Sequence, residues 1–291
     1  MSEAVLPAAV KGRSLWDDAG RRLMANKAAV ASLVVLALLV LLAVLGPYLT
    51  PFAYDQVDKA DVWLPPLRAG HLLGSDALGR DLLARLLMGL RVSLAIGLVA
   101  TFVSLAIGIA WGAVAGYVGG KLDEAMMRIV DVLYSLPFIF FVILLMVTFG
   151  SNIVLIFVAI GAVEWLTMSR IVRGQTLTLK NKEFVEAARA AGLGRGAIIA
   201  RHIVPNLLGP VVIYVTLTIP AVILAESFLS FLGLGVQPPM ASLGALIAAG
   251  ASDMELAPWL LVFPSLVMVL TLMCFNFIGD GLRDAIDPKD R

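Results

Sequence analysis

The chain has few of the residues that metal and disulfide sites need. Its 291 residues include one cysteine, Cys274, and two histidines, His71 and His202. A single cysteine excludes an internal disulfide framework and a cysteine-based metal site. The two histidines are far apart in the sequence, which argues against a histidine metal cluster. Charged residues make up 15% of the chain, against about a quarter in a typical soluble domain.

Several functional classes also lack their usual signatures. The net charge of +1 offers no basic surface for nucleic acid. Gly119-Gly120-Lys121 resembles the end of a phosphate-binding loop, but Ala115 and Leu122 stand where that loop needs glycine and serine or threonine. We therefore expect the chain to bind neither ATP nor another cofactor by itself. A membrane-embedded enzyme is disfavoured because no His-Glu-x-x-His, Gly-x-Ser-x-Gly or paired intramembrane aspartate motif is present.

Long uncharged runs dominate the sequence instead. Hydrophobic residues make up 60% of the chain, and the mean hydropathy is +0.95. A transmembrane helix needs about 20 apolar residues. The runs predict an all-α polytopic membrane protein with six transmembrane helices, near 28–49, 92–120, 126–149, 153–170, 207–232 and 256–279. Gly150-Ser151-Asn152 is the expected break inside the uncharged run 132–163, which is too long for one crossing.

The lysines and arginines predict the orientation. With the N-terminus inside, the inner segments hold 17 of them and the outer segments hold five, all in the long loop 50–91. This bias predicts that both termini are cytoplasmic. The first span is followed by Gly46-Pro47-Tyr48 and not by an Ala-x-Ala cleavage pattern. We therefore interpret this span as a retained anchor rather than a signal peptide.

The sequence divides into three parts. Residues 1–27 form a cytosolic segment whose stretch 14–26 reads as a surface helix, with Ser14 as its cap. Residues 28–91 form the first transmembrane helix and a periplasmic loop. Residues 92–291 form the core, with a cytosolic loop at 170–206. The surface helix is either a flank that sets the topology or a positioning element.

Glycines recur every fourth residue in the second span. The positions are Gly108, Gly112, Gly116 and Gly120. Residues four apart share one face of a helix, and glycines there let another helix approach closely. We interpret the stripe as helix packing within the bundle; an interface with a partner subunit is the alternative.

The loop 170–206 reads as a small helical hairpin. Asn181 is expected to cap a first helix, and Gly192 and Gly194 are expected to end it. A second short helix is expected from Arg195 and should stop before Pro205. The first helix carries an apolar strip suited to a soluble partner, although a loop packed on its own protein is the alternative; the strip comprises Phe184, Ala187, Ala188 and Ala191.

At this loop the sequence resembles a known family. Glu186-Ala187-Ala188, then Gly192, then Pro205 resemble the EAA loop of bacterial ABC importer permeases. His202 and Val204 stand where that pattern has Ile and Leu. Three further stretches resemble dipeptide and oligopeptide permeases in the same order: residues 71–93, Ser227 to Pro238, and Asp280 to Pro288.

The resemblance implies an ABC importer permease fold and an assembly in the inner membrane. The implied partners are a homologous permease subunit, two cytosolic ATPase subunits that bind ATP and magnesium, and a periplasmic or lipid-anchored peptide-binding protein. It also implies a coupling role for the hairpin, with these contact residues: Phe184, Glu186, Ala187, Ala188, Gly192, His202 and Pro205. The function implied is translocation of oligopeptides by alternating access.

Acidic residues inside spans are functional candidates by default. Glu226 is the deepest and is our candidate for the translocation path, where it could meet a peptide's N-terminal amine; a pair with a polar group of another helix is the alternative. Glu164 is expected to pair with Arg170 or to reach the interface. Asp131 is expected to pair with Arg128.

Two rival functions remain at this stage. A secondary transporter that needs no ATPase is one, although we find no repeat between the halves of the chain. An assembly subunit without a path of its own is the other.

Overall fold

The chain folds as a bundle of helices. The computed structural model describes residues 15–150 and 152–286, and every regular element in that part is helical. The helices in chain order are α1 (Leu15–Ala25), α2 (Lys27–Leu49), α3 (Leu82–Val118), α4 (Gly120–Tyr134), α5 (Phe138–Phe149), α6 (Ile153–Leu179), α7 (Glu183–Ala190), α8 (Arg195–Ile198), the π-turn η1 (Ile199–Ile203), α9 (Val204–Phe231), α10 (Leu243–Ser252) and α11 (Trp259–Ile286).

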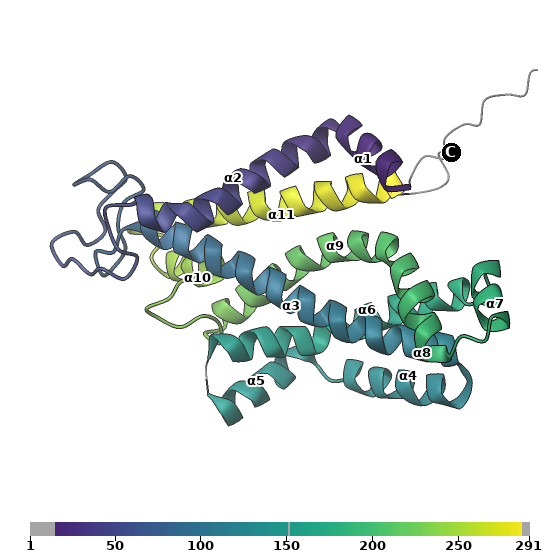
Figure 1. Cartoon of the computed structure of the whole chain (residues 1–291). Helices are drawn as coiled ribbons and strands as arrows, with labels where there is room; N and C mark the ends of the chain where they lie inside the picture. The colour runs from purple at the N-terminus through teal and green to yellow at the C-terminus, as the bar shows by residue number, and fades with distance from the viewer. Residues whose placement is uncertain (1–14, 151, 287–291) are drawn as a thin grey trace, which may run out of the picture.

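The long helices are fit to cross a membrane. Five are long and apolar enough, namely α2, α3, α6, the run from Arg195 to Phe231, and α11; the bent pair α4–α5 makes a sixth if it counts as one span. The bundle has two different ends (Figure 1). The hairpin end carries α7 and α8, and the loop end carries the long connection 50–81 and α10. The predicted all-α polytopic fold is confirmed.

The third predicted span, 126–149, is wrong in detail. The structure divides this region into α4 and α5, which are bent by 81° relative to each other. Proline at position 137 supplies no backbone N–H, and it disfavours helical geometry at the residue before it. The break predicted near Gly150 is present. α5 ends at Phe149, and the Asn152 side chain caps α6 by accepting from the N–H of Val154 at 2.8 Å.

α1 and α11 meet at the hairpin end. The predicted surface helix is α1, which begins at Leu15, and it lies against α11 in Figure 1. At Gly281 of α11 a Cβ atom would come within 3.1 Å of the Leu23 side chain, so glycine permits the close approach. The Asn26 side chain then caps α2 by accepting from the N–H groups of Ala28 and Ala29. The predicted cap Ser14 and the motif at Asp287-Pro288 lie outside the described residues.

The glycine stripe of α3 faces α6. A Cβ at Gly108 would lie 2.6 Å from the Met168 Cβ, and a Cβ at Gly116 would lie 2.9 Å from the Arg173 carbonyl. At Gly112 the added atom would collide with the Ser169 carbonyl. Three of the four stripe glycines therefore sit where two helices touch within one chain.

Gly120 does not belong to this stripe, and its assignment to helix packing is wrong. α3 ends at Val118, and Gly120 begins α4 with a φ of +61°. A Cβ there would meet nothing within 4 Å. The helix turns away after Gly119, so the four-residue spacing does not extend to position 120.

Pro205 does not end a helix, contrary to expectation. α8, η1 and α9 follow one another without a gap, and Pro205 lies in the first turn of α9. In the π-turn the N–H of Val204 donates to the Ile199 carbonyl, five residues back. The wider turn lets the chain pass a residue that has no N–H to donate.

Candidate functional site

The α7 segment at the hairpin end ends in a fixed turn. Gly192 has a φ of +81°, a conformation that glycine adopts without strain. Its N–H donates to the Arg189 carbonyl at 2.9 Å, and the N–H of Leu193 donates to the Ala188 carbonyl at 3.1 Å. These two bonds form a Schellman motif, which terminates a helix and sets the direction of the chain that follows. Gly192 therefore ends α7, as the sequence predicted.

Two basic residues tie α7 to the bundle. The Lys180 ammonium donates to the Gly116 carbonyl at 3.0 Å. The Arg189 guanidinium lies 5.3 Å from the centre of the Tyr117 ring and donates to its hydroxyl at 3.3 Å. Asn181 is not the cap of α7, contrary to expectation: Lys182 occupies that position, and the Asn181 amide donates to the Leu177 carbonyl instead. Both basic residues hold the segment against the end of α3.

α7 has a buried face and an open face. Val185 is fully buried and Ala188 is 6% exposed, and both pack in a cluster with residues of α3, α6 and α9. Phe184 is 39% exposed, and Ala187 and Ala191 are exposed beside it. The predicted apolar strip is therefore split. Ala188 lies on the inner face, whereas the other three positions face outward.

The remaining predicted coupling residues lie on the same segment. Glu186 is exposed in the first turn of α7, where the helix dipole favours an acidic side chain. His202 is partly buried in η1, and its carbonyl accepts from the Asn206 amide at 2.7 Å. Pro205 is exposed at the start of α9. The hairpin end thus presents Glu186, Pro205 and the outer face of α7 without a covering element in the described chain.

Glu226 sits in a cage of serines rather than on a cavity wall. Its side chain has no exposed surface. The Ser230 hydroxyl donates to it at 2.6 Å, and the Ser93 hydroxyl donates at 3.4 Å. Ser242 contacts Ser230 at 3.3 Å, and Ser93 accepts from the N–H of Leu243 at 3.0 Å. The carboxylate therefore joins α3, α9 and α10, and its assignment to the translocation path is corrected to a structural position in this structure.

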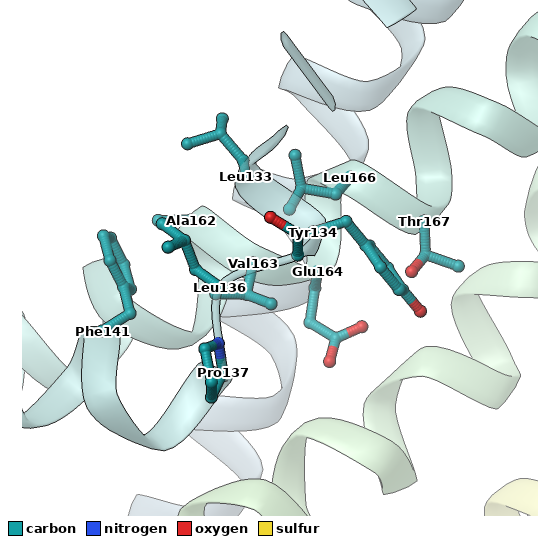
Figure 2. Close-up of a pocket in the computed structure, with 11 residues that line it drawn as sticks. Leu133, Tyr134, Leu136, Pro137, Phe141, Ala162, Val163, Glu164, Leu166 and Thr167 are labelled. Carbon is teal, nitrogen blue, oxygen red and sulfur yellow. The ribbon is translucent and has the colours of Figure 1, made fainter. Parts of the chain in front are cut away.

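Glu164 occupies the opposite kind of environment. It lines a cavity of about 410 Å³ beside the break between α4 and α5. Figure 2 shows its carboxylate projecting from α6 into the space flanked by Pro137 and the Tyr134 ring. Its expected partner, Arg170, pairs with Asp131 at 2.8 Å instead, so the predicted pairs Glu164–Arg170 and Asp131–Arg128 are both wrong. Sequence reasoning treated Glu164 as an interface residue and did not find this cavity.

A buried histidine organises the loop end. His71 is 1% exposed and stacks on the Phe52 ring at 4.3 Å. Its two ring nitrogens lie 2.8 Å from an Asp81 carboxylate oxygen and 3.2 Å from one of Asp61. Burial lowers the pKa of His71, but the hydrogen bonds and charges of Asp81 and Asp61 together outweigh it and raise the pKa above 6.5. Asp81 also caps α3 through the N–H of Ala84.

A further ion pair fixes the hairpin end. Arg173 of α6 binds Asp123 of α4 through two parallel contacts, of 2.6 and 2.7 Å. Bidentate pairs of this kind define geometry as well as charge. The two residues are 50 positions apart in the sequence, so no local pattern indicates the pair.

Comparisons with known proteins match nearly the whole chain. The family described as "Binding-protein-dependent transport system inner membrane component" matches residues 108–291, and the family described as "N-terminal TM domain of oligopeptide transport permease C" matches residues 14–66. The oligopeptide transport system permease protein OppC of Escherichia coli K12 is 59% identical over 97% of this chain and 94% of its own length. The OppC protein of Haemophilus influenzae is 57% identical over 97% and 91%.

More distant proteins share the architecture. The dipeptide transport system permease protein DppC of Bacillus subtilis is 46% identical over 96% of this chain and 87% of its own length. Among solved structures, an inward-facing form of the MetNI methionine ABC transporter matches with a TM-score of 0.56 at 21% identity, over 70% of this chain and 96% of its own. That likeness supports the ABC importer permease fold. With the sequence matches it shows that this multi-pass membrane protein belongs to the family of binding-protein-dependent transport system inner membrane components, within its oligopeptide permease branch.

Proposed function

We propose that this chain is one membrane subunit of an ATP-driven importer that carries oligopeptides across the bacterial inner membrane. The names of its relatives support the substrate class, since the OppC proteins are oligopeptide permeases. The chain pairs with a homologous permease subunit, two cytosolic ATPase subunits that bind ATP and magnesium, and an external peptide-binding protein. Both termini and the hairpin end face the cytoplasm in this proposal, in keeping with the distribution of lysine and arginine.

The open face of α7 carries the proposal. Phe184, Ala187 and Ala191 form an exposed apolar edge on a segment that is held to the bundle by its other face. A partner groove that takes this edge gains buried apolar surface, and Glu186 beside it can form a polar contact. Ala188 supports the edge from beneath. Because the bases of α6 and α9 continue directly from the segment, movement of a bound ATPase subunit is transmitted to two spans.

The proposed transport step needs a second permease subunit of the same fold. Movement of two such subunits as rigid bodies opens the space between them alternately to each side. Peptides pass between the two permeases, and the loop end receives the peptide-binding protein. His202 in η1 and Pro205 in the first turn of α9 lie on the stretch that connects α7 to the span α9.

A crosslink tests this arrangement. Ala187→Cys in a Cys274→Ala background is exposed to a short thiol-to-amine crosslinker in membranes that contain the whole transporter. We expect a product with an ATPase subunit whose yield changes with ATP and vanadate. Lys121→Cys, an exposed position on the same end but outside the hairpin, should yield much less. Equal labelling at the two positions, or none at Ala187→Cys, would remove the coupling role.

A further inference from the structure

The cavity beside Glu164 has the chemistry of a cation site. Glu164 lies 11 positions after the start of α6, or about 16 Å along the helix at 1.5 Å per residue, so its depth is near the middle of the bundle. It is partly buried, and among the residues described no donor or cation is paired with its carboxylate. An unpaired acidic side chain at this depth is costly unless it serves a ligand or pathway.

The broken helix adds negative potential on the same side. α4 ends at Tyr134, and Tyr134, Ser135 and Pro137 all line the cavity. The carbonyl end of a helix carries a partial negative charge. Proline at 137 cannot donate to those carbonyls. A carboxylate and a helix C-terminus therefore face one space, an arrangement that attracts cations in broken transmembrane helices.

Arg170, six positions after Glu164 on α6, already has other partners. Arg170 lies over the Tyr134 ring at 4.4 Å and donates to Asp131 at 2.8 Å. Its charge is balanced by Asp131. Glu164 thus has no basic partner among the described residues.

The lining of the cavity indicates which other groups a ligand can carry. It is mostly apolar, and Thr167 is among its polar residues. The apolar lining comprises Leu133, Leu136, Phe141, Ala162, Val163 and Leu166. A volume of about 410 Å³ is within the range of small-molecule sites. It accommodates a primary amine with one apolar side chain, but not a whole long peptide.

We propose that this cavity binds the N-terminal ammonium group of a peptide in transit, with Glu164 as the charged contact. The proposal rests on the proposed function, and it assigns to Glu164 the role that the sequence first suggested for Glu226. The C-terminal end of α4 faces the same ammonium group and attracts it through its partial negative charge, although the N–H groups of Ser135 and Leu136 already donate to its last carbonyls. The first side chain of the peptide packs against the apolar wall, which accepts many side chains because it makes no directional contact with them.

Photolabelling tests the binding directly. The complete transporter is purified without its binding protein and reconstituted in vesicles of phosphatidylglycerol, which has no amine headgroup. A short peptide with a free N-terminus and a photoreactive first side chain is irradiated on it, and labelled positions are mapped by mass spectrometry. We expect label on α4, α5 or α6 residues of the cavity, and competition by an unlabelled peptide but not by its N-acetyl form.

Three variants make the result decisive. Glu164→Gln should reduce cavity labelling about tenfold, the size of one lost hydrogen bond to a charged group. Glu164→Asp should retain part of it, which guards against a folding defect. Glu124→Gln, an exposed acid of α4 away from the cavity, should label like the unmodified protein.

Other outcomes overturn the proposal in distinguishable ways. Undiminished labelling in Glu164→Gln, or equal competition by the N-acetyl peptide, excludes an ammonium contact. Loss of the partner permease from the Glu164→Gln complex shows that a cation of that subunit occupies the cavity instead. Displacement of the label by phosphatidylethanolamine identifies a lipid headgroup as the occupant. ATP-dependent peptide uptake by the unmodified transporter is measured in parallel, since its absence would contradict the proposed function rather than this site.

Discussion

Two glutamates of this chain show how neighbours decide the role of a side chain. Glu226 and Glu164 are both acids within apolar helices. Glu226 is enclosed by serine hydroxyls from three elements, whereas Glu164 faces a cavity. The sequence marks both as exceptional and ranks Glu226 first by its depth, but it does not reveal the serine partners, because Ser93 is 133 positions from Glu226. Their opposite environments lead to opposite expectations for substitution.

Replacing Glu226 should affect stability more than substrate choice. Glu226→Ala leaves the Ser230 and Ser93 hydroxyls buried without their acceptor, and we expect it to lower the free energy of unfolding by about 2–4 kcal/mol. Glu226→Gln preserves the shape and one acceptor oxygen, so its cost should be smaller. Thermal unfolding in detergent measures both. A change in peptide preference in Glu226→Gln at unchanged stability would contradict this and return Glu226 to the path.

His71 should make the loop end sensitive to pH. Its pKa in the folded chain is above the ordinary 6.5, so the protonated form stabilises the fold. This contribution is complete below pH 6.5 and is lost as the pH rises through the higher folded pKa. We expect residues 50–81 to be cleaved faster by a protease at pH 8 than at pH 6, after correction with an unstructured peptide.

Two histidine variants separate this effect from other titrations. His71→Gln removes the titrating group, and the pH dependence of cleavage in the loop should disappear. His202→Gln lies at the opposite end of the bundle and should leave it unchanged. The same pH dependence in both variants would show that another group controls the loop.

At the scale of helices, the contact between α3 and α6 depends on missing side chains. The glycine stripe allows α6 backbone atoms to lie against α3 at three successive turns. Gly112→Ala should lower the free energy of unfolding by about 1–3 kcal/mol, because the added methyl group overpacks the contact. Gly174→Ala, in α6 but with nothing within 4 Å of the new atom, should be neutral or up to about 1 kcal/mol stabilising. Thermal unfolding of both proteins measures these changes. Equal stability of the two variants would show that the close contact at Gly112 does not stabilise the fold.

The turn after α7 offers a test of coupling at the same scale. A Cβ at Gly192 meets nothing within 4 Å, so Gly192→Asp should fold with a strain of about 1–2 kcal/mol from its left-handed backbone. The new carboxylate lies beside the open face of α7, and we expect several-fold less ATPase subunit to co-purify. Gly120→Asp carries the same kind of strain at an equally open site. If both variants retain the ATPase equally, α7 is not the contact.

Element boundaries show where sequence reasoning succeeded and where it failed. Uncharged runs located five long helices because the bilayer sets their length and composition. The bend at Pro137 was missed because it lies inside the uncharged run 132–163. Hydropathy reports how apolar a segment is, but not whether its helix bends. Pro205 was taken as a stop because a proline lacks an N–H, but a π-turn removes the need for it. Gly192 marked the end of α7 correctly, whereas the predicted cap Asn181 was wrong, and the inward face of α7 depends on Tyr117 and Leu207, which lie in other elements.

At the scale of the whole molecule, we propose that this chain supplies one of the two membrane subunits of a transporter. The apolar side chains on the outside of the bundle include Phe140 and Val147 of α5, which are 70% and 79% exposed. These faces can contact lipid or a second subunit, and composition does not distinguish the two. In the proposed assembly the path runs between this chain and the second permease, and the ATPase subunits supply the energy.

The source of energy separates this reading from a secondary transporter. In proteoliposomes with all partner subunits, we expect ATP on the side of the ATPase subunits to drive peptide transport toward that side. Vanadate should stop the transport, and a proton uncoupler should have no direct effect. The chain reconstituted alone should show no uptake under an imposed proton gradient. A matched preparation that carries Gly192→Asp should bind peptide but not accumulate it, since only its contact with the ATPase is weakened. Uptake by the isolated chain that stops with the uncoupler would require a complete path and a proton-coupled mechanism within a single copy of this fold.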